Sequence, residues 1–284
     1  QAKARFAADT RPGLFLALSG IETDADTVPI ANVATLDRLA FPPRIYGSEN
    51  TLIEAPAHQI ACSVVNLDEH EWSIDGIFWT LSALLRLRSG GTFVPCEIAE
   101  LPWDVIDGCP ADARPRRIST GSRRSPWWPA VKVHVSETDA RWVGDNFETT
   151  LRLRSDRVFH FALEGYYGAF EERDVRMAVS KAWAGIEGLL GISSELRFRI
   201  SMFVATVISS PGEGRMERFA ATSKLYDQRS KVVHGAAIPD SKVQKCAEDS
   251  LEILSQLLVD AIVHRGVRSA VDIEAALLGA LDLN

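Results

Sequence analysis

The sequence predicts an α+β fold, with a mixed α/β N-terminal domain followed by an all-helical C-terminal domain. The first half contains short runs rich in β-branched and aromatic residues, bounded by Gly, Pro and Asn. The second half repeats apolar residues every three to four positions, which is the spacing of amphipathic helices. A stretch rich in Pro, Ser and Arg, residues 109–129, reads as a loop or linker. We place the boundary near residue 145, between domains 1–145 and 146–284.

The N-terminal half predicts strands at residues 43–48, 58–67 and 91–99, and a helix over residues 73–90 that ends at Gly90 or Gly91. Its histidines are scattered, and its acidic residues around 68–71 look like a solvated turn. No acid–base constellation emerges from these residues. We therefore expect a regulatory or recognition domain rather than a second enzyme.

The C-terminal half predicts helices over residues 146–170, 171–190, 194–208, 219–233, 243–262 and 271–281. Gly191 fits a C-terminal cap, and Ser241 with Gln244 has the spacing of a capping box. Ser193 or Ser194 fits the N-cap of the third of these helices. Consecutive amphipathic helices with short connections predict a helical bundle.

Composition and motifs exclude several classes of protein. The 284 residues contain no run of eighteen apolar residues and no signal-peptide core, so we expect a cytoplasmic protein without a membrane span. The four cysteines lie far apart, which favours free thiols. A zinc site from His58, Cys62, Cys96 and Cys109 would lack the usual paired spacings. Nucleotide-loop, dinucleotide, zincin and hydrolase motifs are absent, and we expect no cofactor.

The stretch KLYDQRSKVVHG, residues 224–235, lies in a basic island that begins at Arg215, in a chain of net charge −7. It places Arg229 and His234 five positions apart. Histidine suits proton transfer near neutral pH, and the arginine fork matches phosphate oxygens, so the pair fits metal-independent RNA cleavage. On an ideal helix the two would be about 140° apart, so fraying or ending near Gly235 would help them converge. The structural alternative is a histidine that caps an ordinary helix end.

Two predicted helices upstream of this stretch form a three-part sequence pattern with it. The first matches aromatic–small–Ile/Leu–Glu–x–Leu–Leu at Trp183, Ile186, Glu187, Leu189 and Leu190. The second begins with Glu-Leu and carries arginines, at Glu195, Leu196, Arg197 and Arg199. The stretch 224–235 completes the pattern with Leu225, Tyr226, Arg229, Ser230, Lys231, Val233, His234 and Gly235. Over about residues 146–265 this pattern resembles the HEPN superfamily, most closely its ApeA-like branch.

The resemblance implies a dimerising bundle of four to five helices. Many members are metal-independent ribonucleases of toxin or antiphage-defence systems, with a composite site across the homodimer. It assigns His234 as the acid–base residue and Arg229 as the phosphate ligand. The first 145 residues match no family pattern, and we expect this N-terminal domain to sense a trigger or to restrain activity. Ser230 stands where many active members have Asn, Asp or His. The alternative is a non-catalytic module that binds RNA or protein.

A homodimer also has a physical motive. The Arg229–His234 pair supplies one titratable group, whereas cleavage by 2′-hydroxyl attack is served best by a base and an acid on opposite sides of the phosphate. A two-fold axis would bring a second His234 to the site and would gather two copies of Arg229 and Lys231.

Several other candidate residues allow two interpretations each. Glu187 either orients Arg229 or His234 or lies at the bundle rim, and Tyr226 either stacks an RNA base or belongs to the core. Lys224 and Lys231 flank the pair and are candidate RNA contacts. The arginine-rich segment before Trp127 and Trp128 either binds single-stranded nucleic acid or is a linker whose tryptophans dock on the protein.

Overall fold

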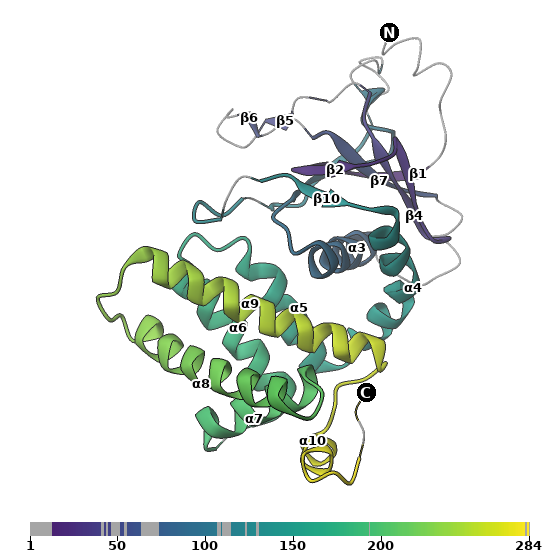
Figure 1. Cartoon of the computed structure of the whole chain (residues 1–284). Helices are drawn as coiled ribbons and strands as arrows, with labels where there is room; N and C mark the ends of the chain where they lie inside the picture. The colour runs from purple at the N-terminus through teal and green to yellow at the C-terminus, as the bar shows by residue number, and fades with distance from the viewer. Residues whose placement is uncertain are drawn as a thin grey trace. The chain divides into compact units, whose positions relative to one another are not determined.

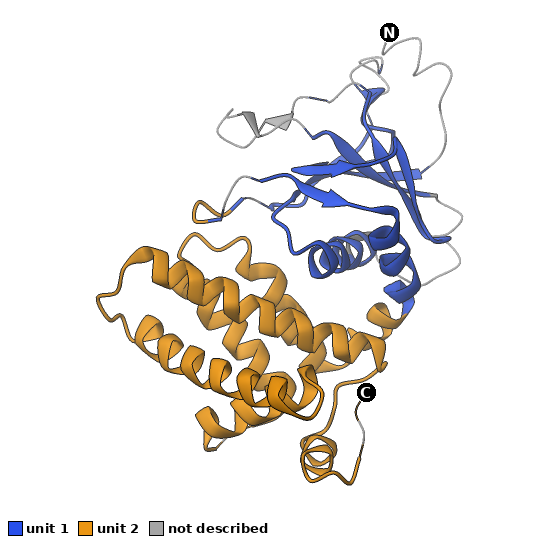
Figure 2. Ribbon diagram, in the orientation of Figure 1, with its two compact units in different colours: residues 1–124, 128–148 blue, residues 125–127, 149–284 orange. Residues whose placement is uncertain are grey.

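The computed structural model describes most of the chain, in two compact units. The described residues are 13–40, 43, 45–46, 52–53, 56–63, 74–106, 109, 115–122, 124–128, 131–192, 194–281 and 283. One unit comprises residues 1–124 and 128–148, and the other comprises residues 125–127 and 149–284 (Figure 2). We refer to them as the sheet unit and the helical unit. An antiparallel sheet with helices precedes a helical region, which confirms the α+β class.

The sheet unit is built around a six-stranded antiparallel sheet of order β3-β4-β7-β1-β8-β9. Its strands are β1 (Gly13–Ser19), β3 (Thr27–Ile30), β4 (Ala34–Arg38), β7 (His58–Ser63), β8 (Val94–Ala99) and β9 (Arg117–Ser119). Strand β2 (Ile21–Thr23) pairs in parallel with β10 (Val133–Val135), and β5 (Ile45–Tyr46) pairs with β6 (Leu52–Ile53). Helix α3 (Ile74–Ser89) packs beside β10 (Figure 1).

The core of the sheet unit forms where the apolar run of β1 meets Trp103. Phe15 and Ala17 of β1 are buried in one cluster with Trp103, which is 1% exposed. The Trp103 indole donates a hydrogen bond of 2.8 Å to the carbonyl of Phe15, and its backbone N–H donates to Gln59 Oε1 at 2.9 Å. These bonds satisfy both N–H groups of a residue that is almost wholly buried.

The sequence analysis did not predict most strands of the sheet. Strands β7 and β8 and helix α3 match predicted elements, but β1, β2, β3 and β4 come from a region where no strand was expected. Part of the expected loop at residues 109–129 is also strand β9, which pairs with β8 at the sheet edge. The prediction of a loop or linker is therefore wrong for residues 117–119.

The helical unit contains the end of α4 (Glu137–Leu153), inside which the two units divide. The remaining helices are α5 (Arg157–Ala169), α6 (Val175–Leu190), α7 (Leu196–Ile208), α8 (Glu213–Val233), α9 (Asp240–Val263) and α10 (Ala270–Leu277). Helix α6 packs against α5 and α9, and α7 packs against α8 (Figure 1). Within the part of the chain that is described, α9 is the longest helix of the bundle.

A close approach of α6 to α9 fixes the centre of the bundle. A Cβ on Gly185 would lie 3.0 Å from a methyl carbon of Leu254, so only glycine fits there without movement of its neighbour. Two residues earlier, the wholly buried Trp183 donates a 2.8 Å hydrogen bond to Ser250 Oγ. That hydroxyl in turn donates to the carbonyl of Cys246. The indole N–H of Trp183 is thus satisfied across the two helices.

Three details of the predicted helices are wrong. The helix expected over residues 146–170 is two helices, because the Asp156 carboxylate accepts hydrogen bonds from two backbone N–H groups and caps α5. Helix α9 is preceded by Pro239 at the N-cap, so Ser241 and Gln244 form no capping box. Helix α7 begins after Glu195, with φ of 51° and no side-chain cap, so Ser194 is not the cap, and Ser193 lies outside the described residues.

None of the helices in the described part of the chain combines the length and apolarity needed to cross a membrane.

Candidate functional site

The C-terminal end of α8 is a regular Schellman motif, and it defines where His234 lies. Gly235 adopts φ of +73°, its N–H donates to the carbonyl of Val232 at 3.2 Å, and the Ala236 N–H donates to the carbonyl of Lys231 at 3.0 Å. His234 is the C-cap residue, and its N–H still donates to the carbonyl of Ser230. The helix therefore stays regular through Val233 and does not fray after Arg229.

Arg176, in the first turn of α6, holds this helix end. Its guanidinium donates to the carbonyl of Val232 at 2.8 Å and to the carbonyl of Ala236 at 3.4 Å. The Val232 carbonyl also accepts the N–H of Gly235, so the guanidinium adds a second donor there, and its positive charge beside the last turn favours the negative end of the helix dipole. Sequence reasoning missed Arg176, because nothing in the local pattern shows that a residue 56 positions upstream reaches the end of α8.

Arg229 lies on the inner side of α8 and is ion-paired. Its Nη2 atom is 3.1 Å from Glu187 Oε1 of α6, and the two side chains are 21% and 26% exposed. Of the two readings of Glu187, the structure shows the one in which this carboxylate bonds to Arg229. Because both groups are largely withdrawn from water, the positive charge of Arg229 is mostly neutralised within the bundle.

Aromatic rings complete the surroundings of Arg229. Its Cζ atom lies 5.6 Å from the ring centre of Tyr226 and 6.0 Å from that of Trp183. The two rings meet edge to face, with their centres 5.4 Å apart. Tyr226 is half-buried in this contact, which places it in the aromatic packing of the bundle. The Arg229 Nε atom is buried and makes no hydrogen bond within the described part of the chain.

Cys246 of α9 is a further neighbour of this guanidinium. Burial raises the pKa of the Cys246 thiol to about 11, while its hydrogen bond with Ser250 and the charge of Arg229 oppose that rise. The thiol is therefore protonated at neutral pH and is no nucleophile. Arg229 accordingly interacts with residues of α6, α8 and α9.

His234, Lys224 and Lys231 share the opposite, outer side of α8. All three are exposed, and their side chains form no hydrogen bond or ion pair to any residue that the structure describes. Lys231 precedes His234 by three positions, so the two are about 60° apart around the helix, against about 140° for Arg229 and His234. Within one protomer, His234 is therefore close in direction to Lys231 and distant from Arg229.

Asp227, the acidic residue that stands between Lys224 and Lys231 on this face, is already paired. Both guanidinium nitrogens of Arg197 that face it lie 2.9 Å from its carboxylate oxygens. This exposed pair contributes little stability, but it leaves the lysines as the uncompensated charges beside His234. The outer face of α8 can thus attract an anion.

The contacts of the arginine-rich segment favour the interpretation that it is a linker whose tryptophans dock on the protein. Trp127 Nε1 and Ser125 Oγ both donate to the carbonyl of Glu172, at 2.9 Å and 2.5 Å, so residues 125–127 dock on the helical unit. Arg117 pairs with Glu97 at 2.6 Å. Arg114 and Arg123 lie outside the described residues. The expectation that a tryptophan of this segment docks on the protein is confirmed for Trp127.

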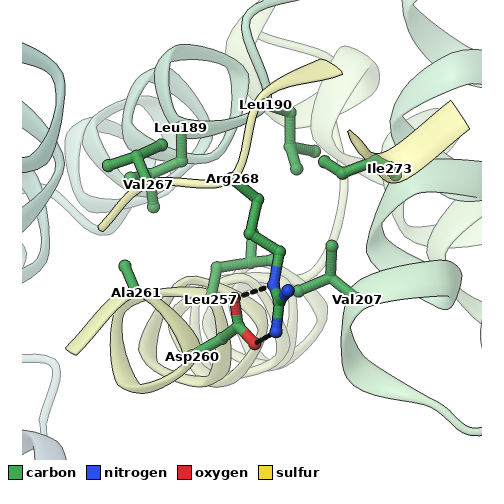
Figure 3. Close-up of a pocket in the computed structure, with 9 residues that line it drawn as sticks. All are labelled: Leu189, Leu190, Val207, Leu257, Asp260, Ala261, Val267, Arg268 and Ile273. Carbon is green, nitrogen blue, oxygen red and sulfur yellow. Dashed lines mark hydrogen bonds and ion pairs between the residues drawn. The ribbon is translucent and has the colours of Figure 1, made fainter. Parts of the chain in front are cut away.

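The helical unit also has a small cavity of about 20 Å³ beside α10, which has room for about one water molecule (Figure 3). Its lining is apolar except for Asp260 and Arg268, which bond to one another across it. The cavity is too small for a ligand. Across the described residues, moreover, no three His, Cys, Asp or Glu side chains gather as a metal site.

Comparison with known proteins adds no relative: no protein-family model, no curated protein and no solved structure matches this chain. The candidate site is therefore defined by the residues at the end of α8 alone.

Proposed function

We propose that the helical unit is a metal-independent endoribonuclease of HEPN type, acting as a toxin or antiphage-defence effector in the cytoplasm. The observation that supports this best is the exposed imidazole of His234. It is presented at the C-cap of α8 by a Schellman motif and by Arg176, on the same face as Lys224 and Lys231. A solvent-facing histidine among uncompensated cations suits acid–base chemistry on a phosphate.

The reaction needs only side chains and the RNA itself. A neutral imidazole removes the proton of a 2′-hydroxyl, the oxygen forms a bond to the adjacent phosphorus, and the bond from phosphorus to the 5′-oxygen breaks. An imidazolium group gives a proton to that leaving oxygen. The products are a 2′,3′-cyclic phosphate and a 5′-hydroxyl, and nearby cations stabilise the additional negative charge of the transition state.

The functional unit that we propose is a homodimer with the two His234 side chains at one composite site. One imidazole cannot stand on both sides of the phosphate, whereas a two-fold axis supplies a second copy. Mixing wild-type and His234→Ala subunits tests this. A site that needs both histidines leaves about a quarter of the activity in an equal mixture, and independent sites leave about half.

For the sheet unit we propose a regulatory role, with a phage-derived or cellular trigger as its ligand. Its His58 is 3% exposed and its Cys62 is 2% exposed, so neither group is presented to a substrate. The full chain should cleave RNA faster in extracts of phage-infected cells than in extracts of uninfected cells. Equal rates in the two extracts would contradict the regulatory role.

The direct test of the proposed activity uses purified full-length protein, single-stranded and structured RNA, and EDTA. We expect fragments from the wild type, and a loss of at least about 100-fold in His234→Ala, the usual range for removal of an acid–base group. Cleavage that survives the substitution unchanged would show that His234 is not involved.

A second candidate is a non-catalytic module that binds RNA or protein. It is favoured by the ion pair of Arg229 with Glu187, which withdraws the arginine from the face that carries His234. In the same assay this candidate predicts retained RNA without new fragments.

A further inference from the structure

Arg229 of α8 and Arg176 of α6 each bond to the other helix, at two different levels, and this shows where the Arg229 guanidinium lies. Arg176 reaches the carbonyl of Val232 at the end of α8, and Trp183 meets Tyr226 about two turns further back. The two helices therefore run in opposite directions along their contact. Glu187, the partner of Arg229, lies eleven residues beyond Arg176, or about 16 Å further along α6.

The Arg229 side chain consequently extends back along α8, away from the end that carries His234. This direction agrees with the general tilt of helical side chains toward the helix N-terminus. The guanidinium is also separated from His234 around the helix, by about 140° at the level of the backbone. Distance along the axis and direction around it thus both keep the guanidinium from His234 within a protomer.

A phosphate would meet an unfavourable environment at Arg229. The Glu187 carboxylate lies 3.1 Å from Nη2, so an anion on the same guanidinium edge would face a second negative charge at close range. If Arg229 turned outward instead, Glu187 would be left largely buried without its cation, which is costly. The ring contacts with Trp183 and Tyr226 would be lost as well.

Lys231 has none of these constraints. It is exposed, it is about 60° from His234 around the helix, and it makes no ion pair with any described residue. Its flexible stem carries a compact charge that can follow a phosphate beside the imidazole.

We infer that Arg229 is a positioning residue, which anchors α8 to α6 through Glu187, and that Lys231 contacts the RNA phosphate beside His234. The inference rests on the proposed ribonuclease function and changes the division of labour within it. Arg229 and Arg176 hold α8 on α6 at two points. Together they set the direction in which His234 and Lys231 face.

The test compares full-length wild type with Arg229→Gln, Glu187→Gln, Lys231→Gln and Lys245→Gln. Lys245 is an exposed lysine of α9 and serves as the control for loss of one charge. Unfolding is followed by circular dichroism, and turnover is measured well below each midpoint. Affinity for a fluorescent single-stranded RNA of mixed sequence is measured from about 50 to about 200 mM salt, with EDTA present.

We expect Arg229→Gln and Glu187→Gln to lower the unfolding midpoint by about 3–6 °C, since each leaves a partly buried partner unpaired. Both should lower turnover at least about 10-fold, as a misplaced acid–base group does, with RNA affinity and its salt slope unchanged. Arg229→Lys, which keeps the charge, should recover part of both losses. Lys231→Gln should reduce the salt slope by about 0.7 per site and leave the midpoint unchanged. Lys245→Gln should change neither quantity.

Other results would distinguish a failure of the Arg229 inference from a failure of the proposed ribonuclease function. A reduced salt slope in Arg229→Gln, or tighter RNA binding in Glu187→Gln, would make Arg229 a phosphate ligand and overturn the inference. A lower midpoint with normal turnover would make Arg229 merely structural, which also overturns it. If the wild type neither binds nor cleaves RNA, the proposed function fails and the Lys231 assignment fails with it. The unfolding midpoints would then still decide whether Arg229 anchors α8.

Discussion

Helices α8 and α9 end in the same local structure, with a histidine at each C-cap. The N–H of His234 donates to the carbonyl of Ser230 at 3.1 Å, and the N–H of His264 donates to the carbonyl of Asp260 at 2.9 Å. A left-handed residue follows in both cases, Gly235 with φ of 73° and Arg265 with φ of 58°. The N–H of the residue after that, Ala236 or Gly266, donates to the carbonyl five positions earlier and closes each motif.

The two imidazoles nevertheless have opposite surroundings. The Nδ1 atom of His264 is 3.0 Å from the carbonyl of Asp260 and 3.1 Å from its carboxylate, so Nδ1 is the donor. Its Nε2 atom is 2.6 Å from Arg268, which also binds Asp260 through two hydrogen bonds and the carbonyl of Leu283 through a third. Both ring nitrogens of His264 are therefore engaged in holding the segment after α9.

His234 has no such network among the described residues. Lys224 and Lys231 lie on its face, and the Asp227 carboxylate there is paired with Arg197. The comparison teaches that a histidine beside a helix-ending glycine or left-handed residue is not informative by itself. The side chains that contact the imidazole from other elements decide whether the histidine is structural or is available for chemistry.

The largest effect we expect is on RNA cleavage, and it separates the two histidines. His234→Ala should reduce the cleavage rate at least about 100-fold, because it removes the acid–base group. His264→Ala should leave the rate within about 3-fold, provided that the assay runs below the unfolding midpoint, since its imidazole is engaged in the α9–α10 contacts. Equal losses in both variants would mean that the helix ends do not differ in function.

The next effect is on stability, at the α9 end. Arg268→Met leaves Asp260, 15% exposed, without its cation, and should cost about 3 kcal/mol of unfolding free energy. The matched control is Arg197→Met, which breaks the exposed pair with Asp227 and should cost less than about 1 kcal/mol. Thermal unfolding followed by circular dichroism measures both. Similar losses would show that the Arg268 network is no tighter than a surface ion pair.

A buried histidine of the sheet unit extends the comparison to a third environment. Burial, followed by the charges of Arg38 and Lys132, lowers the pKa of His58 from 6.5 to about 4, against an opposing effect of Glu22. Folding therefore favours the neutral ring, and its stabilising contribution is complete above pH 6.5 and declines as the pH falls toward 4.

The unfolding midpoint of the wild type should thus fall more steeply between pH 6.5 and 4 than that of His58→Gln. Parallel curves for the wild type and His58→Gln would contradict the assignment of a neutral, buried His58.

The smallest effects concern the left-handed residues, and they should have opposite signs. Gly235→Ala introduces a Cβ at φ of +73° and should cost about 1 kcal/mol. Arg265→Gly removes a side chain from φ of +58° and should stabilise the chain by up to about 1 kcal/mol. Urea unfolding with a constant slope resolves both. A change of the same sign in the two variants would contradict the shared Schellman geometry.

Local sequence signals predicted much of the bundle. Apolar periodicity gives α6 and α9, and Gly191 is indeed a left-handed C-cap, with φ of 61°. The His-Gly pair likewise marks the end of α8, because capping depends on residues close in the chain. The strands before residue 40 were missed, because short apolar runs do not show whether a segment pairs with strands far along the chain.

The site shows the same division between local and distant information. Sequence alone identifies Arg229 and His234 as a candidate pair, but it does not show that α8 remains regular and separates them. That separation follows from Glu187 on the inner side and from Arg176 at the helix end, and both act across the fold. Contacts of this kind depend on how α6 packs against α8, and neither residue's own neighbours in sequence reveal it.

The most direct test of the ribonuclease account is the chemical identity of the RNA ends. Purified full-length protein would be incubated in EDTA with an RNA of known sequence, and the fragments analysed by mass spectrometry. We expect 2′,3′-cyclic phosphates opposite 5′-hydroxyls in the wild-type digest, and intact RNA with His234→Ala. Fragments with 5′-phosphates, or the same cyclic ends from His234→Ala, would contradict it.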